Sequence, residues 1–187
     1  MQRVFWFIII FLFVCHNGFC QGRRPVTKND INKAEFCKAI NAIIADAGNR
    51  YKNISGNPNP EWQHIDAYAW DSKIRVPGAI SSWIFCSMGL WTSYSGVFFK
   101  TNNKAELTQG FESYRALLDG CLSAQGYVAD SLTRARSEVP GFRDILFRPQ
   151  IDEYTVDASR PQVSLHVCAL SDSFFVKISV NDLNNPR

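Results

Sequence analysis

A strict period of two in the last third of the chain is the feature that most constrains the fold. Two runs of alternating apolar residues are joined by the polar turn Ser171-Asp172-Ser173. Because successive side chains of a strand point to opposite faces of a sheet, each run predicts a half-buried strand, and the short turn predicts that the two strands are antiparallel. The alternating residues are Val163, Leu165, Val167 and Ala169 in the first run and Phe174, Val176, Ile178 and Val180 in the second.

The middle of the chain has the same period. Residues 68–76 alternate as a strand, with Tyr68 and Trp70 on the face that is predicted to be buried. Pro77 and Gly78 interrupt this strand, because proline cannot donate to a strand ladder and glycine permits a turn. The remaining predictions outside helices are strands over residues 79–86, 91–100 and 144–147, a turn over 87–90, a loop over 53–61, and a loop or short helix over 127–140.

Two segments instead repeat their apolar residues at helical spacing. An N-cap at Thr27 or Asn29 precedes the first, and Asn103 with Glu106 gives the second the spacing of a capping box. Gly126 is the predicted stop of the second helix. The apolar stripes consist of Phe36, Ile40, Ile43, Ile44, Ala47 and Tyr51 in the first helix and of Leu107, Phe111, Tyr114, Leu118, Cys121 and Leu122 in the second.

These elements predict one α+β domain over residues 29–181. Strands that follow one another through short turns form antiparallel sheets. We therefore expect a two-layer domain, in which a sheet of about five strands carries the two main amphipathic helices on one face. Residues 21–28 are expected to form a flexible start and residues 182–187 a polar tail. The sequence contains no recognisable internal repeat.

Residues 1–20 have the layout of a secretory signal peptide. Arg3 precedes an unbroken apolar run over residues 4–14, which spans only about 16 Å as a helix, roughly half of a bilayer's hydrocarbon core. Small residues near the end of the segment place cleavage between Cys20 and Gln21. We therefore expect a protein that is exported to the periplasm or the exterior and meets the membrane only transiently during export.

Charge and cysteine usage narrow the functional class. The chain carries 20 Lys and Arg against 17 Asp and Glu without a basic cluster, so nucleic acid is not an expected partner. The cysteines after the cleavage position are Cys37, Cys86, Cys121 and Cys168. In an exported protein they predict two disulfides in one of three pairings, while their apolar neighbours fit buried thiols equally well. Their wide spacing argues against a zinc site, and no cofactor is expected.

Two motifs resemble small exported bacterial proteins without an assigned activity. They are KIRVPGAISSWI at residues 73–84 and YRALLDGCL at residues 114–122. The order of elements is also similar to that of the chaperones that bind type III secretion effectors, although those chaperones are cytoplasmic. The resemblance concerns topology, and it transfers no role to an individual residue.

Aromatic residues are concentrated between positions 62 and 94 of the chain. By strand alternation, Trp70 lies on the face that is predicted to be the core, whereas Trp83 and Trp91 lie on the same face as nearby serines. Exposed tryptophan often marks a binding surface. We therefore predict a non-catalytic binding protein whose partner is another protein, with Trp83, Trp91 and Tyr94 as anchors on the sheet face that the helices leave open. The sequence leaves the oligomeric state open.

Two alternatives assign other chemistry to the same chain. An exported hydrolase would pair Ser81, Ser82 or Cys168 with His166, because a nucleophile needs an adjacent base, although no GxSxG motif surrounds a serine. A small apolar-ligand or lipid binder would instead use the aromatics as the lining of a cup between sheet and helices. The acidic residues and histidine of EWQHID at residues 61–66 are too few for an expected metal site.

Overall fold

The computed structural model describes residues 31–60, 67–87, 91–136, 139–152 and 155–182. Within these ranges the chain forms two α-helices, one short 3-10 helix and eight strands. In chain order they are α2 (Lys33–Ala47), β1 (Ser55–Pro58), β2 (Ala67–Ser72), β3 (Ser81–Ser87), β4 (Trp91–Thr101), α3 (Lys104–Leu122), η3 (Ser123–Gln125), β5 (Tyr127–Arg136), β6 (Arg143–Pro149), β7 (Gln162–Leu170) and β8 (Ser173–Asp182). The predicted signal peptide, the flexible start, the caps at Thr27 and Asn29, the segment 61–66 and most of the polar tail lie outside the described residues.

All eight strands belong to one antiparallel sheet with the order β1-β2-β3-β4-β8-β7-β6-β5. The predicted α+β class and the antiparallel sheet are therefore confirmed, while the predicted number of about five strands is too low. Within the described ranges, β4 and β8 form the central pair, and β1 and β5 form the edges.

The order of elements repeats in the two halves of the described chain. Each half is a helix followed by four strands that pair in sequence order: α2 with β1–β4, and α3 with β5–β8. The last strands of the two halves, β4 and β8, pair with each other, and Ser95 and Ser179 are register partners there. The sequence did not predict this repeat, because topology is repeated and the residue pattern is not.

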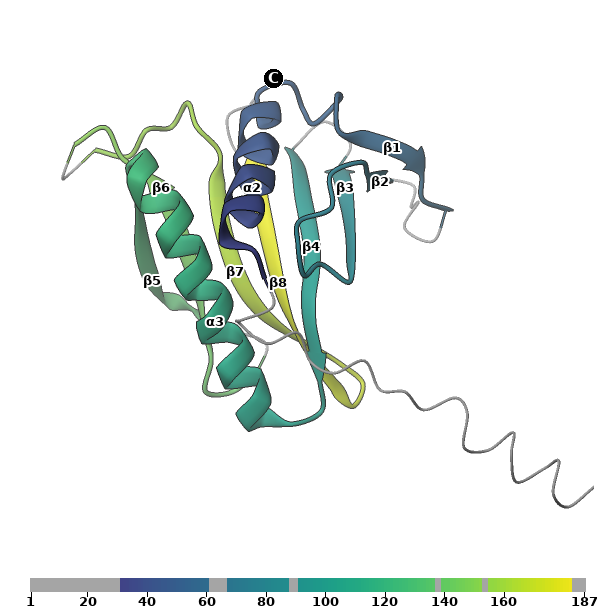
Figure 1. The fold of residues 1–187 in the computed structure, drawn as a ribbon, viewed down its shortest axis with the longest axis vertical. Helices are drawn as coiled ribbons and strands as arrows, with labels where there is room; N and C mark the ends of the chain where they lie inside the picture. The colour runs from purple at the N-terminus through teal and green to yellow at the C-terminus, as the bar shows by residue number, and fades with distance from the viewer. Residues whose placement is uncertain (1–30, 61–66, 88–90, 137–138, 153–154, 183–187) are drawn as a thin grey trace, which may run out of the picture.

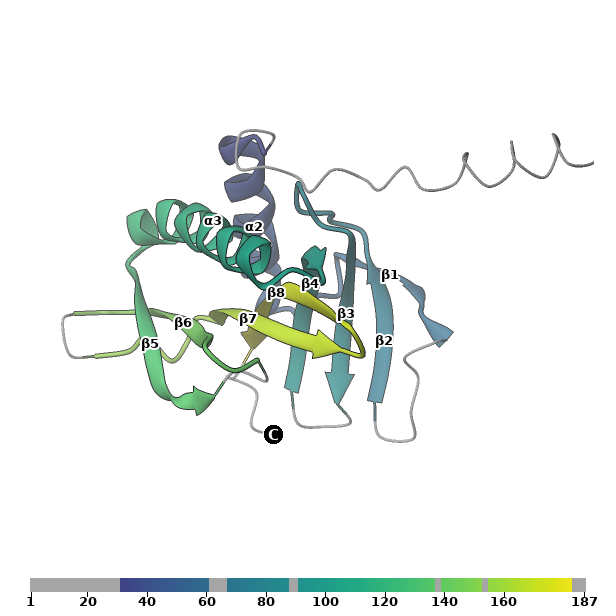
Figure 2. The same cartoon turned by 90° about the horizontal axis from the view of Figure 1, so that it is seen from below.

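Both helices lie on the same face of the sheet, as the two views show (Figures 1 and 2). Asn32 caps α2, and Asn103 caps α3 by accepting hydrogen bonds from the backbone amides of Ala105 and Glu106. Gly126 ends the segment after α3 with a positive φ of 77°, as predicted. Every residue of the two predicted apolar stripes is buried in the core, so both helix predictions are confirmed in their packing.

Aromatic rings fill the layer between helices and sheet. The Phe98 ring of β4 lies 6.2 Å from the Phe36 ring of α2 and 5.2 Å from the Tyr114 ring of α3, measured between centroids. Gly96 makes room for this cluster, because a Cβ there would lie 2.8 Å from the Phe98 ring and 2.9 Å from the Tyr94 hydroxyl. The cluster thus joins both helices to the centre of the sheet.

The strands that the sequence did not predict are the two edge strands, β1 and β5. Residues 127–140 resemble a loop because β5 does not alternate: Tyr127 is buried, but Val128 and Ala129 are both exposed. An edge strand has one neighbouring strand and less area to bury, so its apolar pattern is weak. The face predicted for Trp70, Ile74 and Val76 is confirmed, since Val76 is in the core and the other two pack against it. Tyr68 shares this face but is 44% exposed, so its predicted burial is wrong.

One disulfide joins the two helices on top of the sheet. It links Cys37 of α2 to Cys121 of α3, with Cα atoms 5.2 Å apart, and such a bond fits an oxidising, exported location. Cys86 and Cys168 are thiols. They cannot bridge to each other, because their strands lie about 14 Å apart across β4 and β8. One of the two predicted disulfides is therefore present, and the other two cysteines are thiols that are half-buried instead of buried.

Neither described α-helix combines the length and the apolar character that crossing a bilayer requires.

The buried tyrosines predict a loss of stability at alkaline pH. Burial raises the pKa of Tyr114 from 10.0 to about 12, and burial raises the pKa of Tyr94 as well, with the Ser82 hydroxyl opposing that rise. Above pH 10 the unfolded chain releases protons that the folded chain retains, so folding loses up to about 1.4 kcal/mol per pH unit for each such tyrosine. Urea unfolding is expected to show full stability below pH 10 and a decline from pH 10 towards 12.

The matched variant is Tyr114→Phe, which removes one titrating group and keeps the ring. Its unfolding free energy should fall less steeply between pH 10 and 12 than that of the wild type. Equal slopes for the two proteins would show that Tyr114 does not carry this dependence.

Candidate functional site on the outer face

The candidate site lies on the outer face of the sheet, which is the face opposite α2 and α3 (Figure 2). Strand register aligns one residue from each of seven strands in a row across this face. From β2 to β5 the row consists of Asp71, Trp83, Ser95, Ser179, Ser164, Leu146 and Asp130.

Three serines form the middle of this row and are called the serine row: Ser95 on β4, Ser179 on β8 and Ser164 on β7. All three are buried, although they lie on the face opposite the described helices. The Ser95 and Ser179 hydroxyls are 3.2 Å apart, and the Ser164 hydroxyl lies 3.5 Å from the Ser179 carbonyl oxygen. Because a buried hydroxyl is costly without a hydrogen bond, these contacts let serine occupy the middle of the sheet.

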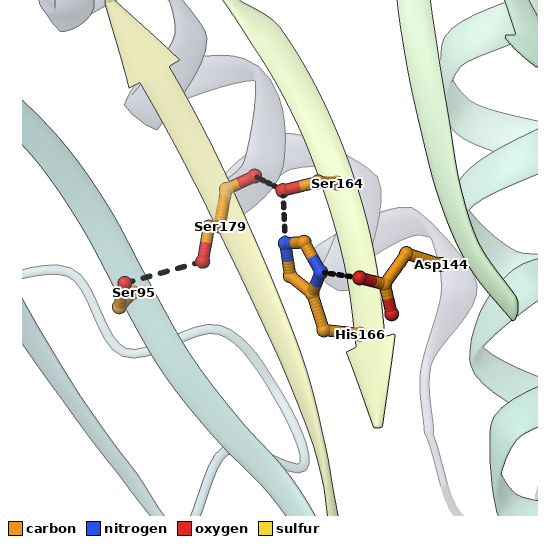
Figure 3. A network of polar contacts seen from close by, with 5 residues as sticks. All are labelled: Ser95, Asp144, Ser164, His166 and Ser179. Atoms are coloured by element: carbon orange, nitrogen blue, oxygen red, sulfur yellow. Dashed lines mark hydrogen bonds and ion pairs between the residues drawn. The ribbon is translucent and has the colours of Figure 1, made fainter. Parts of the chain in front are cut away.

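His166 connects the serine row to a carboxylate (Figure 3). Its Nε2 lies 2.6 Å from Ser164 Oγ, and its Nδ1 lies 3.0 Å from Asp144 Oδ2. Ser164 and His166 are two positions apart on β7 and therefore share a face, and β6 brings Asp144 alongside because Ile145 pairs with Leu165. Three side chains from two neighbouring strands thus form one continuous chain of contacts.

The direction of the hydrogen bonds between Asp144, His166 and Ser164 follows from which of these groups can donate a proton. An ionised Asp144 can only accept, so the proton between it and His166 must be on Nδ1. Nε2 of a neutral His166 is then an acceptor, and the Ser164 hydroxyl gives its one proton to this nitrogen at 2.6 Å instead of to the Ser179 carbonyl oxygen at 3.5 Å. The arrangement is a nucleophile, a base and a carboxylate that orients the base, which is the order used in serine acyl transfer.

Two buried polar atoms on β6, beside the contacts of Ser164 and His166, are not hydrogen-bonded within the described part of the chain. Asp144 Oδ1 and Arg148 Nε have no hydrogen-bond partner among the described residues. Arg148 uses its Nη1 atom on Asp130, at 3.6 Å. Since buried polar groups are nearly always hydrogen-bonded in native proteins, both atoms are places where a bound molecule or water would contribute a bond.

An aromatic cluster lies on the β3–β4 side of the serine row and consists of Trp83, Phe85 and Trp91. The Phe85 and Trp91 rings are 5.3 Å apart between centroids, and Trp91 is 41% exposed. Trp83 is half-buried and pairs with Ser95 in the row. The outer face therefore combines an apolar aromatic end with a polar, titratable end around His166.

The structure separates the predicted anchors. Trp83 and Trp91 lie on the outer face, but Tyr94 is wrong as a surface anchor because it is fully buried. Its register partners Ile84 and Val180 belong to the core beneath the helices. The error arises because Tyr94 has the opposite parity to Ser93 and Ser95, so strand alternation sends it to the helix side.

The serines predicted as partners of His166 are also not the ones beside it. Ser81 lies on β3, roughly 14 Å from β7, and Ser82 has the parity of the helix side. Ser164 contacts the imidazole instead, and Cys168 lies two residues further along the same strand. The period of two could have identified Ser164 from sequence, whereas Asp144 required the register between β6 and β7.

Comparisons with protein-family models, curated proteins and solved structures gave no match for this chain. The resemblance to small exported proteins and to secretion chaperones therefore stays a prediction. Among the described residues, no group of three or more His, Cys, Asp or Glu side chains is placed to hold a metal ion.

Proposed function

We propose that this protein is exported and binds a partner protein on the outer face of its sheet. The observation that carries the proposal is the aromatic cluster, in which the partly exposed Trp91 stacks near Phe85 on a face otherwise rich in small polar side chains. Tryptophan is enriched among the few residues that dominate binding energy at protein interfaces. The opposite face carries an aromatic pair of its own, Tyr68 and Trp70 with ring centroids 6.2 Å apart, but the helices cover the centre of that face.

The polar end of the outer face supports the same function. Asp144 Oδ1 and Arg148 Nε offer a buried acceptor and a buried donor on one strand. A partner segment that supplies a donor and an acceptor there would gain two hydrogen bonds to groups already desolvated. Aromatic anchors thus give affinity at one end, and polar groups give orientation at the other.

Export is the second part of the proposal. It rests on the signal-like residues 1–20 and on the disulfide between Cys37 and Cys121. Intact-mass analysis of protein recovered from its native compartment is expected to give a chain that begins at Gln21 and has one disulfide. A cytoplasmic protein that retains Met1 and reduced thiols would contradict it.

Binding is tested by comparing the partner affinity of the wild type with that of variants in the aromatic cluster. The purified wild-type protein is immobilised, exported proteins are passed over it, and the captured protein is identified and titrated. Trp83→Ala and Trp91→Ala are each expected to weaken its binding by tenfold or more, because truncating an interface hot spot costs about 2 kcal/mol or more.

Tyr68→Ala is the matched control. Tyr68 is exposed to a similar extent, 44%, but has the parity of the helix side. It should bind the partner as the wild type does. The proposal fails when no exported protein is retained, and also when Tyr68→Ala weakens binding as much as the two tryptophan variants.

A further inference from the structure

We propose that Ser164 is an acyl-accepting nucleophile, with His166 as its base, and that the outer face hydrolyses small esters. This activity goes beyond partner binding and does not rest on it. It also differs from the hydrolase expected from sequence, because the nucleophile is Ser164 and not Ser81, Ser82 or Cys168.

The first support is geometric. A hydroxyl becomes a nucleophile when a base accepts its proton within hydrogen-bond distance and a third group orients that base. Ser164 Oγ lies 2.6 Å from Nε2 of His166, and Asp144 Oδ2 lies 3.0 Å from Nδ1 (Figure 3). The two ring nitrogens thus have the separate partners that the mechanism requires, and Asp144 is a positioning residue.

The second support is the surroundings of the pair. Lys177 on β8 is the register partner of His166, so its cationic side chain leaves the backbone next to that of His166 on the outer face. A cation there would stabilise the oxyanion that forms when a carbonyl is attacked. The Ser179 hydroxyl in the neighbouring strand is a second candidate donor.

Burial limits the substrate class. Ser164 is only 3% exposed, whereas the His166 side chain is 27% exposed. The approach to Ser164 Oγ is therefore narrow, and a slender acyl group such as acetyl fits it better than a branched or aromatic one. We assign the substrate class as short, unbranched acyl esters.

The reaction is balanced by these groups and water. Ser164 Oγ bonds to the acyl carbon while its proton moves to Nε2 of His166, and that proton passes to the leaving alkoxide as the ester C–O bond breaks. Water then attacks the acyl-serine, gives a proton to Nε2, and releases the carboxylic acid as Ser164 Oγ recovers its proton. The products are one alcohol and one acid.

The test treats the purified full-length protein with p-nitrophenyl acetate and, separately, with phenylmethylsulfonyl fluoride. Peptide mapping is expected to place one acetyl or one sulfonyl group on Ser164. Release of p-nitrophenolate is expected to fall at least tenfold in Ser164→Ala and in His166→Ala. Ser113→Ala, which removes a hydroxyl on α3, should match the wild type.

The split between kcat and KM is the readout for Asp144. In Asp144→Asn, kcat for p-nitrophenyl acetate should fall while KM changes little, because a neutral amide orients the imidazole less well than the carboxylate that lies 3.0 Å from Nδ1. Label found only on lysines, an unlabelled Ser164, or equal rates in wild type and Ser164→Ala would each overturn the proposal. Peptide mapping of the labelled wild-type protein tests whether Ser164 is the nucleophile even when a variant fails to fold.

Discussion

Replacing both Cys37 and Cys121 with serine is expected to lower the free energy of unfolding by about 2–5 kcal/mol. The bond joins residues 84 positions apart, so it removes a large loop-closure entropy from the unfolded chain. It also links α2 to α3, and these helices belong to different halves of the topological repeat. Without it, the two helices are held on the sheet by their apolar stripes and by the hydrogen bond that the Tyr114 hydroxyl donates to the Phe98 carbonyl oxygen.

Urea unfolding under oxidising and reducing conditions checks this expectation. Reductant should lower the midpoint of the wild type to that of the double variant, and it should leave the double variant unchanged. Because Cys86 and Cys168 are thiols, they supply no second reducible bond in the described chain. A wild-type midpoint that does not respond to reductant would contradict the bridge.

The second large effect is expected for Phe98→Ala, at about 3–5 kcal/mol. Phe98 is 1% exposed, and its ring contacts rings from both helices, at 6.2 Å to Phe36 and 5.2 Å to Tyr114. Truncation loses the transfer free energy of a phenyl ring and leaves a cavity between layers that packing closes only in part.

Tyr68→Ala serves as the control for Phe98→Ala, because its ring is 44% exposed and leaves no enclosed cavity. Thermal and urea unfolding should give a loss of about 1 kcal/mol or less for this variant. Similar losses for the two substitutions would mean that the aromatic layer is not the centre of the core.

Elements with a buried face were readable from sequence, and edge elements were not. The alternation of β7 and β8 and the stripes of α2 and α3 were predicted because each buries most of one side against the core, although Ala169 at the end of β7 is exposed. β1 and β5 were missed because an edge strand has a partner on one side only, so burial leaves little pattern in its residues. Sheet order is non-local, and nothing in the alternation of β4 reveals that it pairs with β8.

The residues of the candidate site also differ in whether the sequence could predict them. Ser164 and His166 are neighbours on one strand face, so their proximity follows from a period of two. Asp144 comes to His166 only through the register of β6 against β7, which pairs Ile145 with Leu165. Tyr94 illustrates the reverse error, since its chemistry suggested a surface anchor while its parity on β4 placed it under the helices.

The most direct test of the account is a hydroxyl-radical footprint of the protein with its captured partner. If the partner binds on the outer face, oxidation of Trp83 and Trp91 falls on binding, while Tyr68 stays as reactive as in the unbound protein. Protection of Tyr68 with unchanged oxidation of Trp83 and Trp91 would contradict it and move the binding surface to the helix side of the sheet.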